Sequence, residues 1–259
     1  MRALATALLL LFVAPAPAAA QHVYVSSGVE YLVGDYGAPE KSKTLYAPFS
    51  VDFLAEGWVL SATIPVVRVS GETFFIGENI PAPIIDRLLD RPEVRDLMEP
   101  RSGFGDISAT IRKEFALSED WYVSAICTVS APTGDDTRGL GAGAWSGAYE
   151  TELLREFDEA YIYGVFGRRF SQDVQSLPLS DTWRASIGGA QHLGRDFWLS
   201  ANYDWREPLL EQSTSLSEAM IALSAPLNQS LQVQVYVVAG FTESSPDYGL
   251  GVQFSLAAF

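Results

Sequence analysis

Apolar and polar residues alternate one by one through long stretches of this chain, and this two-residue period constrains the fold more than any other feature. Successive side chains of a β-strand point to opposite faces, so strict alternation gives one apolar and one polar face. In the segment 248–258 the apolar set is Tyr248, Leu250, Val252, Phe254 and Leu256. A wall of such strands, with lipid outside and a polar interior, is typical of a transmembrane β-barrel.

Alternation and turn residues together predict an all-β fold: a transmembrane antiparallel up-and-down β-barrel of about twelve strands. Other apolar faces include Leu45 to Phe53 at odd positions and Phe197 to Trp205 at odd positions. The strands are expected near residues 23–34, 44–54, 58–69, 104–115, 121–131, 148–157, 160–170, 182–193, 197–206, 215–225, 230–241 and 248–258.

The connections between these expected strands alternate between short and long. Short turns are expected at 55–57, 116–120, 158–159, 194–196 and 227–229, and longer loops near 35–43, 70–103, 132–147, 171–181, 207–214 and 242–247. Outer-membrane barrels have short periplasmic turns and longer extracellular loops. Trp58, Trp121 and Phe197 each follow a short turn, which predicts an aromatic girdle at the periplasmic interface.

The N-terminal segment has the pattern of a secretory signal peptide over residues 1–20. Arg2 supplies a positive charge, an apolar stretch that includes Leu8 to Leu11 follows, and Ala18 to Ala20 offer a small-residue cleavage site. Pro15 and Pro17 interrupt the apolar stretch before it reaches the roughly 18 residues needed to span a membrane as a helix. We expect residues 21–259 to form the barrel domain, in a bacterial outer membrane.

Composition narrows the choice of partners. The formal net charge of −15 argues against binding nucleic acid, because the chain has no basic patch to neutralise phosphates. Cys127 is the only cysteine, so no disulfide can form within the chain, and we expect it to be a small apolar filler. The expected partners are membrane lipid, lipopolysaccharide and a small-molecule solute, with the barrel a monomer and without a cofactor.

Charged residues occupy the positions that alternate with the apolar faces. A charge facing lipid costs about 2–4 kcal/mol for Arg or Lys at the bilayer centre, so these side chains are expected to line the lumen. The lumen-lining candidates are Glu30, Asp52, Arg112, Glu114, Glu150, Glu152, Arg184, Asp204, Arg206 and Glu218. Two interpretations stay open: the network lines a permeation path that favours cations or polar neutral solutes, or it fills a narrow lumen as structure.

The segment 71–103 is the least strand-like part of the expected barrel domain. Ile84, Ile85, Leu88 and Leu89 recur at helical spacing with charged residues between them, which predicts a short amphipathic helix. One interpretation makes these four residues a gate over the extracellular mouth. The other makes the helix a cap on the barrel rim or a contact for lipopolysaccharide.

Small-residue motifs at the strand and loop junctions suggest a family. They are Gly34-Asp-Tyr-Gly37, Ile64-Pro65, Gly103-Phe-Gly-Asp106, Ala131-Pro-Thr-Gly-Asp135 and Gly139-Leu-Gly-Ala-Gly143. In this order the chain resembles the bacterial outer-membrane transporters grouped with phenol-degradation (MetA-pathway) proteins. The resemblance covers nearly the whole chain after residue 21 and implies a barrel that passes small, often aromatic or apolar, compounds.

Catalysis and metal binding have weak support in the sequence. His22 and His192 are the only histidines, both are expected near the periplasmic end, and no His-x-Ser-Asn-Gly arrangement accompanies them. We therefore expect no catalytic residue and no metal site. The leading hypothesis is passive diffusion of small solutes through the barrel; the alternatives are a closed structural or adhesive barrel and an outer-membrane lipid-modifying enzyme.

Overall fold

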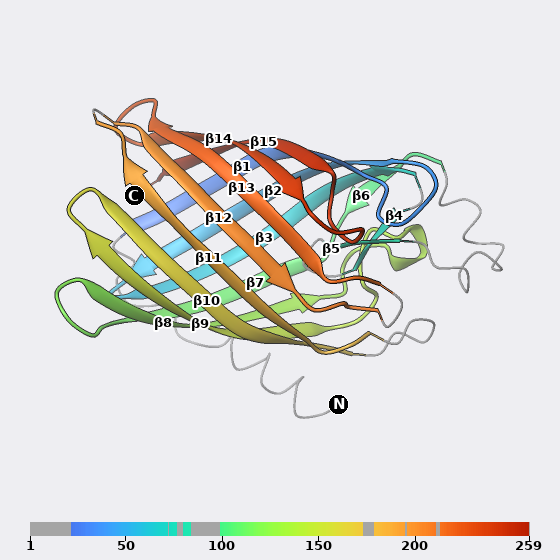
Figure 1. Cartoon of the computed structure of the whole chain (residues 1–259), viewed down its shortest axis with the longest axis horizontal. Helices are drawn as coiled ribbons and strands as arrows, with labels where there is room; N and C mark the ends of the chain where they lie inside the picture. The colour runs from blue at the N-terminus through green and yellow to red at the C-terminus, as the bar shows by residue number, and fades with distance from the viewer. Residues whose placement is uncertain are drawn as a thin grey trace.

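The computed structural model of the chain describes residues 22–71, 73–76, 80–83, 99–172, 179–194, 196–210 and 213–258, and its main feature is one closed antiparallel barrel (Figure 1). The wall consists of β1 (His22–Gly34), β2 (Ser42–Ala55), β3 (Trp58–Ser70), β6 (Arg101–Phe104), β7 (Ile107–Ala116), β8 (Trp121–Ala131), β9 (Ser146–Phe157), β10 (Ala160–Ser171), β11 (Thr182–His192), β12 (Trp198–Arg206), β13 (Leu216–Pro226), β14 (Leu231–Gly240) and β15 (Tyr248–Ala257).

Each wall strand pairs with its neighbours in sequence, and β1 pairs with β15 to close the sheet. Since β6 and β7 both pair with β3 and follow each other directly, they are two parts of one wall strand, which makes twelve. Closure leaves no exposed sheet edge in the wall. The predicted twelve-stranded up-and-down barrel is confirmed, with strand boundaries within three residues of the predicted ones.

A β-bulge separates β6 from β7. β3 advances three residues from Val66 to Thr63, while the facing chain advances four, from Phe104 to Ser108. The extra residue reverses the alternation, so Gly103 and Ser108 both pair with inward-facing residues of β3 although their numbers differ in parity. The prediction of a strand starting at 104 therefore missed β6, because a period-two pattern does not continue through a bulge.

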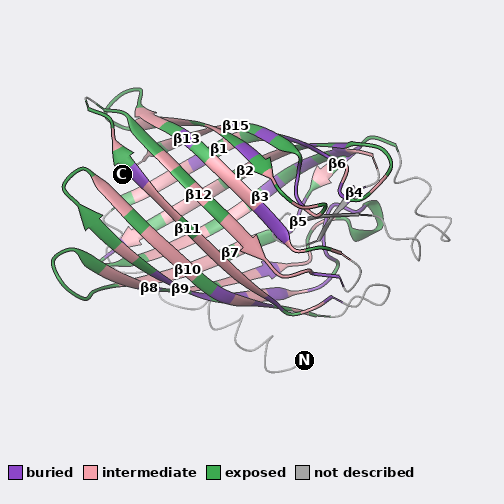
Figure 2. Ribbon diagram, in the orientation of Figure 1, coloured by how far each residue is buried: buried purple, intermediate pink, exposed green. Residues whose placement is uncertain are grey.

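The exterior of the barrel is apolar. Large hydrophobic side chains stay exposed on the outer face of the wall, such as Phe49, Ile187 and Leu250, and exposed and half-buried residues alternate along the strands (Figure 2). An exposed apolar belt around a closed barrel fits the hydrocarbon layer of a membrane. This arrangement agrees with the predicted outer-membrane location. Among the described residues, no helix has the length and apolar character needed to cross a membrane.

Short turns lie at one end of the barrel and longer loops at the other (Figure 1). The β2–β3 turn has positive φ at both central residues, 44° at Glu56 and 76° at Gly57, which is the tight turn favoured in two-residue hairpins. Trp58, Trp121 and Phe197 lie exposed beside the short turns, as the predicted periplasmic girdle requires. On the long-loop side, a 3₁₀ turn, η2 (Asp136–Arg138), lies between β8 and β9.

The segment 71–103 contains a hairpin that the sequence did not predict, formed by β4 (Thr73–Ile76) and β5 (Ile80–Pro83). The predicted amphipathic helix, with Ile84, Ile85, Leu88 and Leu89, lies outside the described residues. So does the predicted signal peptide over residues 1–20.

Candidate functional site

The candidate site is the inner face of the barrel. Alternation places the predicted polar residues on the side opposite the exposed apolar belt: Glu30 on β1, Asp52 on β2, Arg112 and Glu114 on β7, Glu150 and Glu152 on β9, Arg184 on β11, Asp204 and Arg206 on β12, and Glu218 on β13. The structure brings eight of these ten together on the wall from β7 to β13, and leaves Glu30 and Asp52 on the opposite part.

The eight charges fall in two neighbouring rows of the sheet. Cross-strand register links Arg112, Ile126, Glu150, Gly167, Arg184 and Arg206 in one row. The row on its periplasmic side runs through Glu114, Ser124, Glu152, Val165, Ser186, Asp204 and Glu218. A row with three arginines thus lies directly beside a row with four carboxylates, which allows pairing along the wall.

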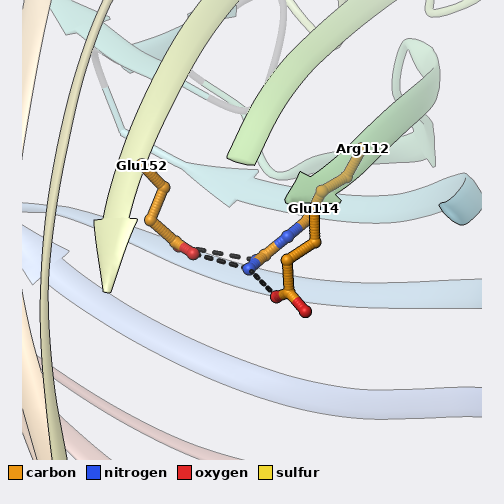
Figure 3. Close-up of polar contacts among 3 residues, drawn as sticks. All are labelled: Arg112, Glu114 and Glu152. Atoms are coloured by element: carbon orange, nitrogen blue, oxygen red, sulfur yellow. Dashed lines mark hydrogen bonds and ion pairs between the residues drawn. The ribbon is translucent and has the colours of Figure 1, made fainter. Parts of the chain in front are cut away.

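Arg112 lies between two carboxylates of the row on the periplasmic side, Glu152 and Glu114 (Figure 3). Its Nη2 is 2.5 Å from Glu152 Oε1 and 3.4 Å from Glu114 Oε2. On the other side of the cluster, Arg184 Nε is 3.0 Å from Glu150 Oε1. The Arg112–Glu114 pair lies within one strand, and the other two pairs each connect residues two strands apart. All three follow the wall and do not cross the lumen.

The paired charges remain in contact with open space. The exposed fractions of the side chains are 29% for Arg112, 41% for Glu114 and 35% for Arg184, although all three face inward, whereas the partners Glu152 and Glu150 are only 11% and 9% exposed. A cavity of about 330 Å³ reaches Arg112 and Glu114 from the periplasmic end, beside His22 and Val59. A second cavity, of about 310 Å³, lies between Tyr161, Trp198, Ser224 and Gln234 at the same end. Open space therefore lies beside the charged wall at the periplasmic end.

Glu30 lies in a different environment, between tyrosines. It pairs in register with Tyr46 on one side and with Gly251 on the other, and Gly251 pairs with Tyr236. The ring of Tyr236 lies where a Cβ of Gly251 would be, so the glycine lets the ring cover the neighbouring strand towards Glu30. This part of the wall is lined by aromatic rings and lacks the arginines of the opposite side.

The β8–β9 loop enters the extracellular end of the lumen. Leu140 has an exposed fraction of 1% and packs against Val67, Val69 and Tyr46, which all belong to the inner face. Asp106, at the bulge, holds this loop: its carboxylate accepts hydrogen bonds from the Gly134 N–H at 2.9 Å and the Ala142 N–H at 2.7 Å. The loop therefore enters the barrel and places an apolar side chain in it.

The β1–β2 loop contributes a second inserted residue. Tyr36 adopts a positive φ of 51° and is almost wholly buried, with its ring against Gly34. Its hydroxyl has no hydrogen-bond partner among the described residues, and burial, reinforced by the charges of Glu218 and Glu30, raises the pKa of that hydroxyl above its ordinary value. Tyr36 and Leu140 together narrow the extracellular mouth.

The sequence prediction did not identify Tyr36, Leu140 or the anchoring role of Asp106. Both inserted side chains are bulky residues next to glycine in an otherwise small or polar loop, in Asp35-Tyr-Gly37 and Gly139-Leu-Gly141. That contrast was the available signal, because an apolar side chain in an extracellular loop needs a surface to cover it. The predicted gate residues Ile84, Ile85, Leu88 and Leu89 lie outside the described residues.

The two histidines lie at the periplasmic end. His192 faces inward, with its ring 5.1 Å from that of Trp198 on the paired strand, and His22 is exposed at the start of β1. Cys127 lies exposed on the lipid-facing side of β8. Within the described ranges, no group of His, Cys, Asp and Glu side chains has the geometry of a metal site.

Comparison with known proteins supports the fold. No family model and no curated protein matches the sequence. The structure is similar to the COG4313 outer-membrane channel from Pseudomonas putida F1, with a TM-score of 0.70 and 13% identity over 94% of this chain and 99% of that chain. It is also similar to the KdgM porin, with a TM-score of 0.54 and 7% identity over 91% of this chain and 99% of that chain. For the CymD monoaromatic hydrocarbon channel the TM-score is 0.51, with 10% identity over 92% of this chain and 89% of that chain. At these identities the likeness establishes a shared barrel fold.

Proposed function

We propose that this protein is an outer-membrane channel through which small solutes diffuse passively, and that it works as a monomer surrounded by membrane lipid and lipopolysaccharide. The observation that carries the proposal is the accessible charged wall: Arg112, Glu114 and Arg184 face inward and yet keep about a third of their side-chain surface exposed. Ion pairs that only filled a lumen would be packed away from solvent. Paired and accessible charges suit a water-filled passage.

The solute is proposed to be small and apolar or aromatic, as for the phenol-degradation (MetA-pathway) transporters that the sequence resembles. Tyr46, Tyr236, Tyr161 and Trp198 supply aromatic rings on the inner face from the extracellular part of the lumen to the periplasmic cavity. Such rings contact planar apolar solutes favourably. CymD, a monoaromatic hydrocarbon channel, shares the fold and supports this choice of solute class.

The proposal is tested by reconstituting the purified barrel into planar bilayers and into liposomes. We expect resolvable single-channel currents in KCl, and faster uptake of a small phenol into liposomes that contain the protein than into protein-free liposomes. A barrel that is folded, as judged by its heat-dependent migration on gels, but gives neither current nor uptake would contradict the proposal.

A closed structural or adhesive barrel is the second candidate, favoured by the buried cluster of Leu140, Val67 and Val69 at the extracellular end. The two functions differ in what happens when the cluster is loosened. If the protein is a narrowed channel, shortening Leu140 increases the current. If it is a closed barrel, neither the wild-type protein nor a Leu140→Ala variant gives a current.

A further inference from the structure

The charges on the outer face of the barrel all have one sign. Lys43, Arg68, Lys113, Arg155 and Arg168 occupy outward-facing positions of the wall strands, whereas every Asp and Glu within these strands faces inward. This segregation occurs in a chain with 32 acidic and 17 basic residues, so it does not follow from composition. Between the exposed acidic residues of the turns, such as Glu56 and Asp120, the outward faces of the wall strands therefore carry positive charge alone.

Three of these five cations share one local arrangement. The cation is followed two residues later by a Phe on the same face, and a Trp lies directly opposite on the paired strand. Lys113 Nζ is 5.0 Å from the Trp58 ring and 5.8 Å from the Phe115 ring. Arg155 Cζ is 5.2 Å from Trp121 and 4.8 Å from Phe157. The third set is Arg168 with Trp183 and Phe170, at 5.3 and 5.4 Å.

We call the sets around Lys113 and Arg155 the periplasmic clamps, because Trp58 and Trp121 begin their strands directly after short turns. Trp rings at this height lie at the level of the lipid head groups. Within each clamp the cation lies closer to the centre of the membrane than the Phe. The next outward-facing residue towards the membrane centre is apolar: Ile111 beside Lys113, and Leu153 beside Arg155. A lipid seated here would have its head group at the cation and its acyl chains on the apolar belt.

Within the described ranges, the cations of the two periplasmic clamps have no anionic partner. Among the described residues, no carboxylate forms an ion pair with Lys113 or Arg155, whereas Arg168 at the other end of the barrel is 3.4 Å from Asp181. Lys113 donates one hydrogen bond, to the Glu56 carbonyl at 2.8 Å, and an ammonium group has three protons to donate. Both cations are held by aromatic rings with donors left for an external acceptor.

We propose that the two periplasmic clamps bind the phosphate groups of anionic phospholipids, such as phosphatidylglycerol, in the periplasmic leaflet. Ammonium and guanidinium groups donate strong, charge-assisted hydrogen bonds to phosphate oxygens, and flanking aromatic rings fix the cation without neutralising it. A zwitterionic lipid has the same phosphate but carries an ammonium group that a clamp repels. The site lies on the outer surface, so the proposal does not depend on whether the lumen conducts.

The test is native mass spectrometry of the full barrel in detergent, with phosphatidylglycerol or phosphatidylethanolamine added. The variants are Lys113→Gln, Arg155→Gln and the double substitution. Lys41→Gln is the matched control, because it removes the same charge from an exposed loop lysine that pairs with Asp247. We expect phosphatidylglycerol binding to weaken about five-fold for each clamp cation removed, and to stay unchanged in the control.

Two results would overturn the proposal. One is equal phosphatidylglycerol retention by the wild-type protein and the double variant; the other is equal retention of the two lipids by the wild-type protein. Should the double variant fail to fold, the wild-type protein still decides the matter, since binding through phosphate must weaken as ionic strength rises. The paired substitutions Lys113→Arg and Arg155→Lys retain the charges and are expected to keep the lipid preference.

Discussion

Glu150 on β9 reaches Arg184 on β11 across a complete intervening strand, with Glu150 Oε1 3.0 Å from Arg184 Nε. Gly167 of β10 pairs in register with both residues, and its missing side chain leaves the space through which Glu150 extends. A Cβ at Gly167 would collide with the Tyr149 carbonyl oxygen and lie 2.6 Å from Glu150 Cγ. The ion pair therefore depends on a glycine that takes no part in the bond itself.

A Gly167→Ala substitution is expected to destabilise the barrel by about 2 kcal/mol, because the added methyl group overpacks the wall against the Tyr149 carbonyl and displaces the Glu150 side chain. The measurement is guanidinium unfolding in detergent, followed by tryptophan fluorescence. Gly164→Ala is the matched control on the same strand: this glycine faces outward, and its added Cβ would meet no atom closer than 3.9 Å. Equal unfolding midpoints for the two variants would show that Glu150 does not need the space over Gly167.

Arg112 offers a test of the charged wall as the lining of a conducting path. An Arg112→Gln substitution leaves Glu114 and Glu152 without their shared cation, so the lumen becomes more negative and the preference for K⁺ over Cl⁻ is expected to rise several-fold. The reversal potential in a KCl gradient measures this preference.

Lys113→Gln is the control for this experiment, because it makes the same charge change on the next residue of the same strand but on the lipid-facing side. Its reversal potential should match that of the wild-type protein. Identical shifts in the two variants would mean that ions respond to the overall charge of the barrel rather than to the inner wall.

The wall could be predicted from the sequence almost completely. Alternation predicts both that a segment forms a strand and which of its faces points inward. The apolar positions from Leu45 to Phe53 identified the lipid side of β2, and they placed Asp52 on the opposite side without knowledge of any partner strand. The pairing of Arg112 with Glu152 could not be predicted with the same ease. It depends on the register of three strands, and register is set by turns and bulges together.

The loops were much less predictable, because an inserted loop has no period. Leu140 lies in the lumen through contacts with Val67 and Val69, residues about 70 positions earlier in the chain. Asp106 bonds the amides of another loop, at Gly134 and Ala142, which lie 28 and 36 positions later in the chain. The bulge beside Asp106 was missed for a related reason: Gly105 and Asp106 interrupt the alternation over only two residues.

Shortening Leu140 is expected to widen the extracellular end of the lumen. The Leu140→Ala substitution removes most of a side chain that is 1% exposed, which should cost about 3 kcal/mol of stability and increase single-channel conductance. Conductance in planar bilayers and the rate of liposome swelling are the two measurements.

The control for Leu140 is Leu117→Ala. This residue lies in a periplasmic turn, 61% exposed, and contributes no packing to the extracellular cluster. It should leave conductance and stability unchanged. If Leu140→Ala lowers stability while conductance stays at the wild-type value, the narrowest point of the lumen lies elsewhere.

Tyr36 should make the stability of the barrel depend on alkaline pH. Burial raises the pKa of its hydroxyl above the ordinary value of 10.0, so the unfolded chain loses this proton first, and stability that is complete below pH 10 declines as the pH rises further. The decline cannot exceed about 1.4 kcal/mol per pH unit for one group.

Tyr36→Phe keeps the buried ring and removes the hydroxyl, which has no hydrogen-bond partner among the described residues. We expect this variant to be at least as stable as the wild-type protein at pH 7 and to show a shallower decline in guanidinium unfolding between pH 10 and 12. Parallel curves for the two proteins would mean that the Tyr36 hydroxyl reaches solvent and ionises as it does in the unfolded chain.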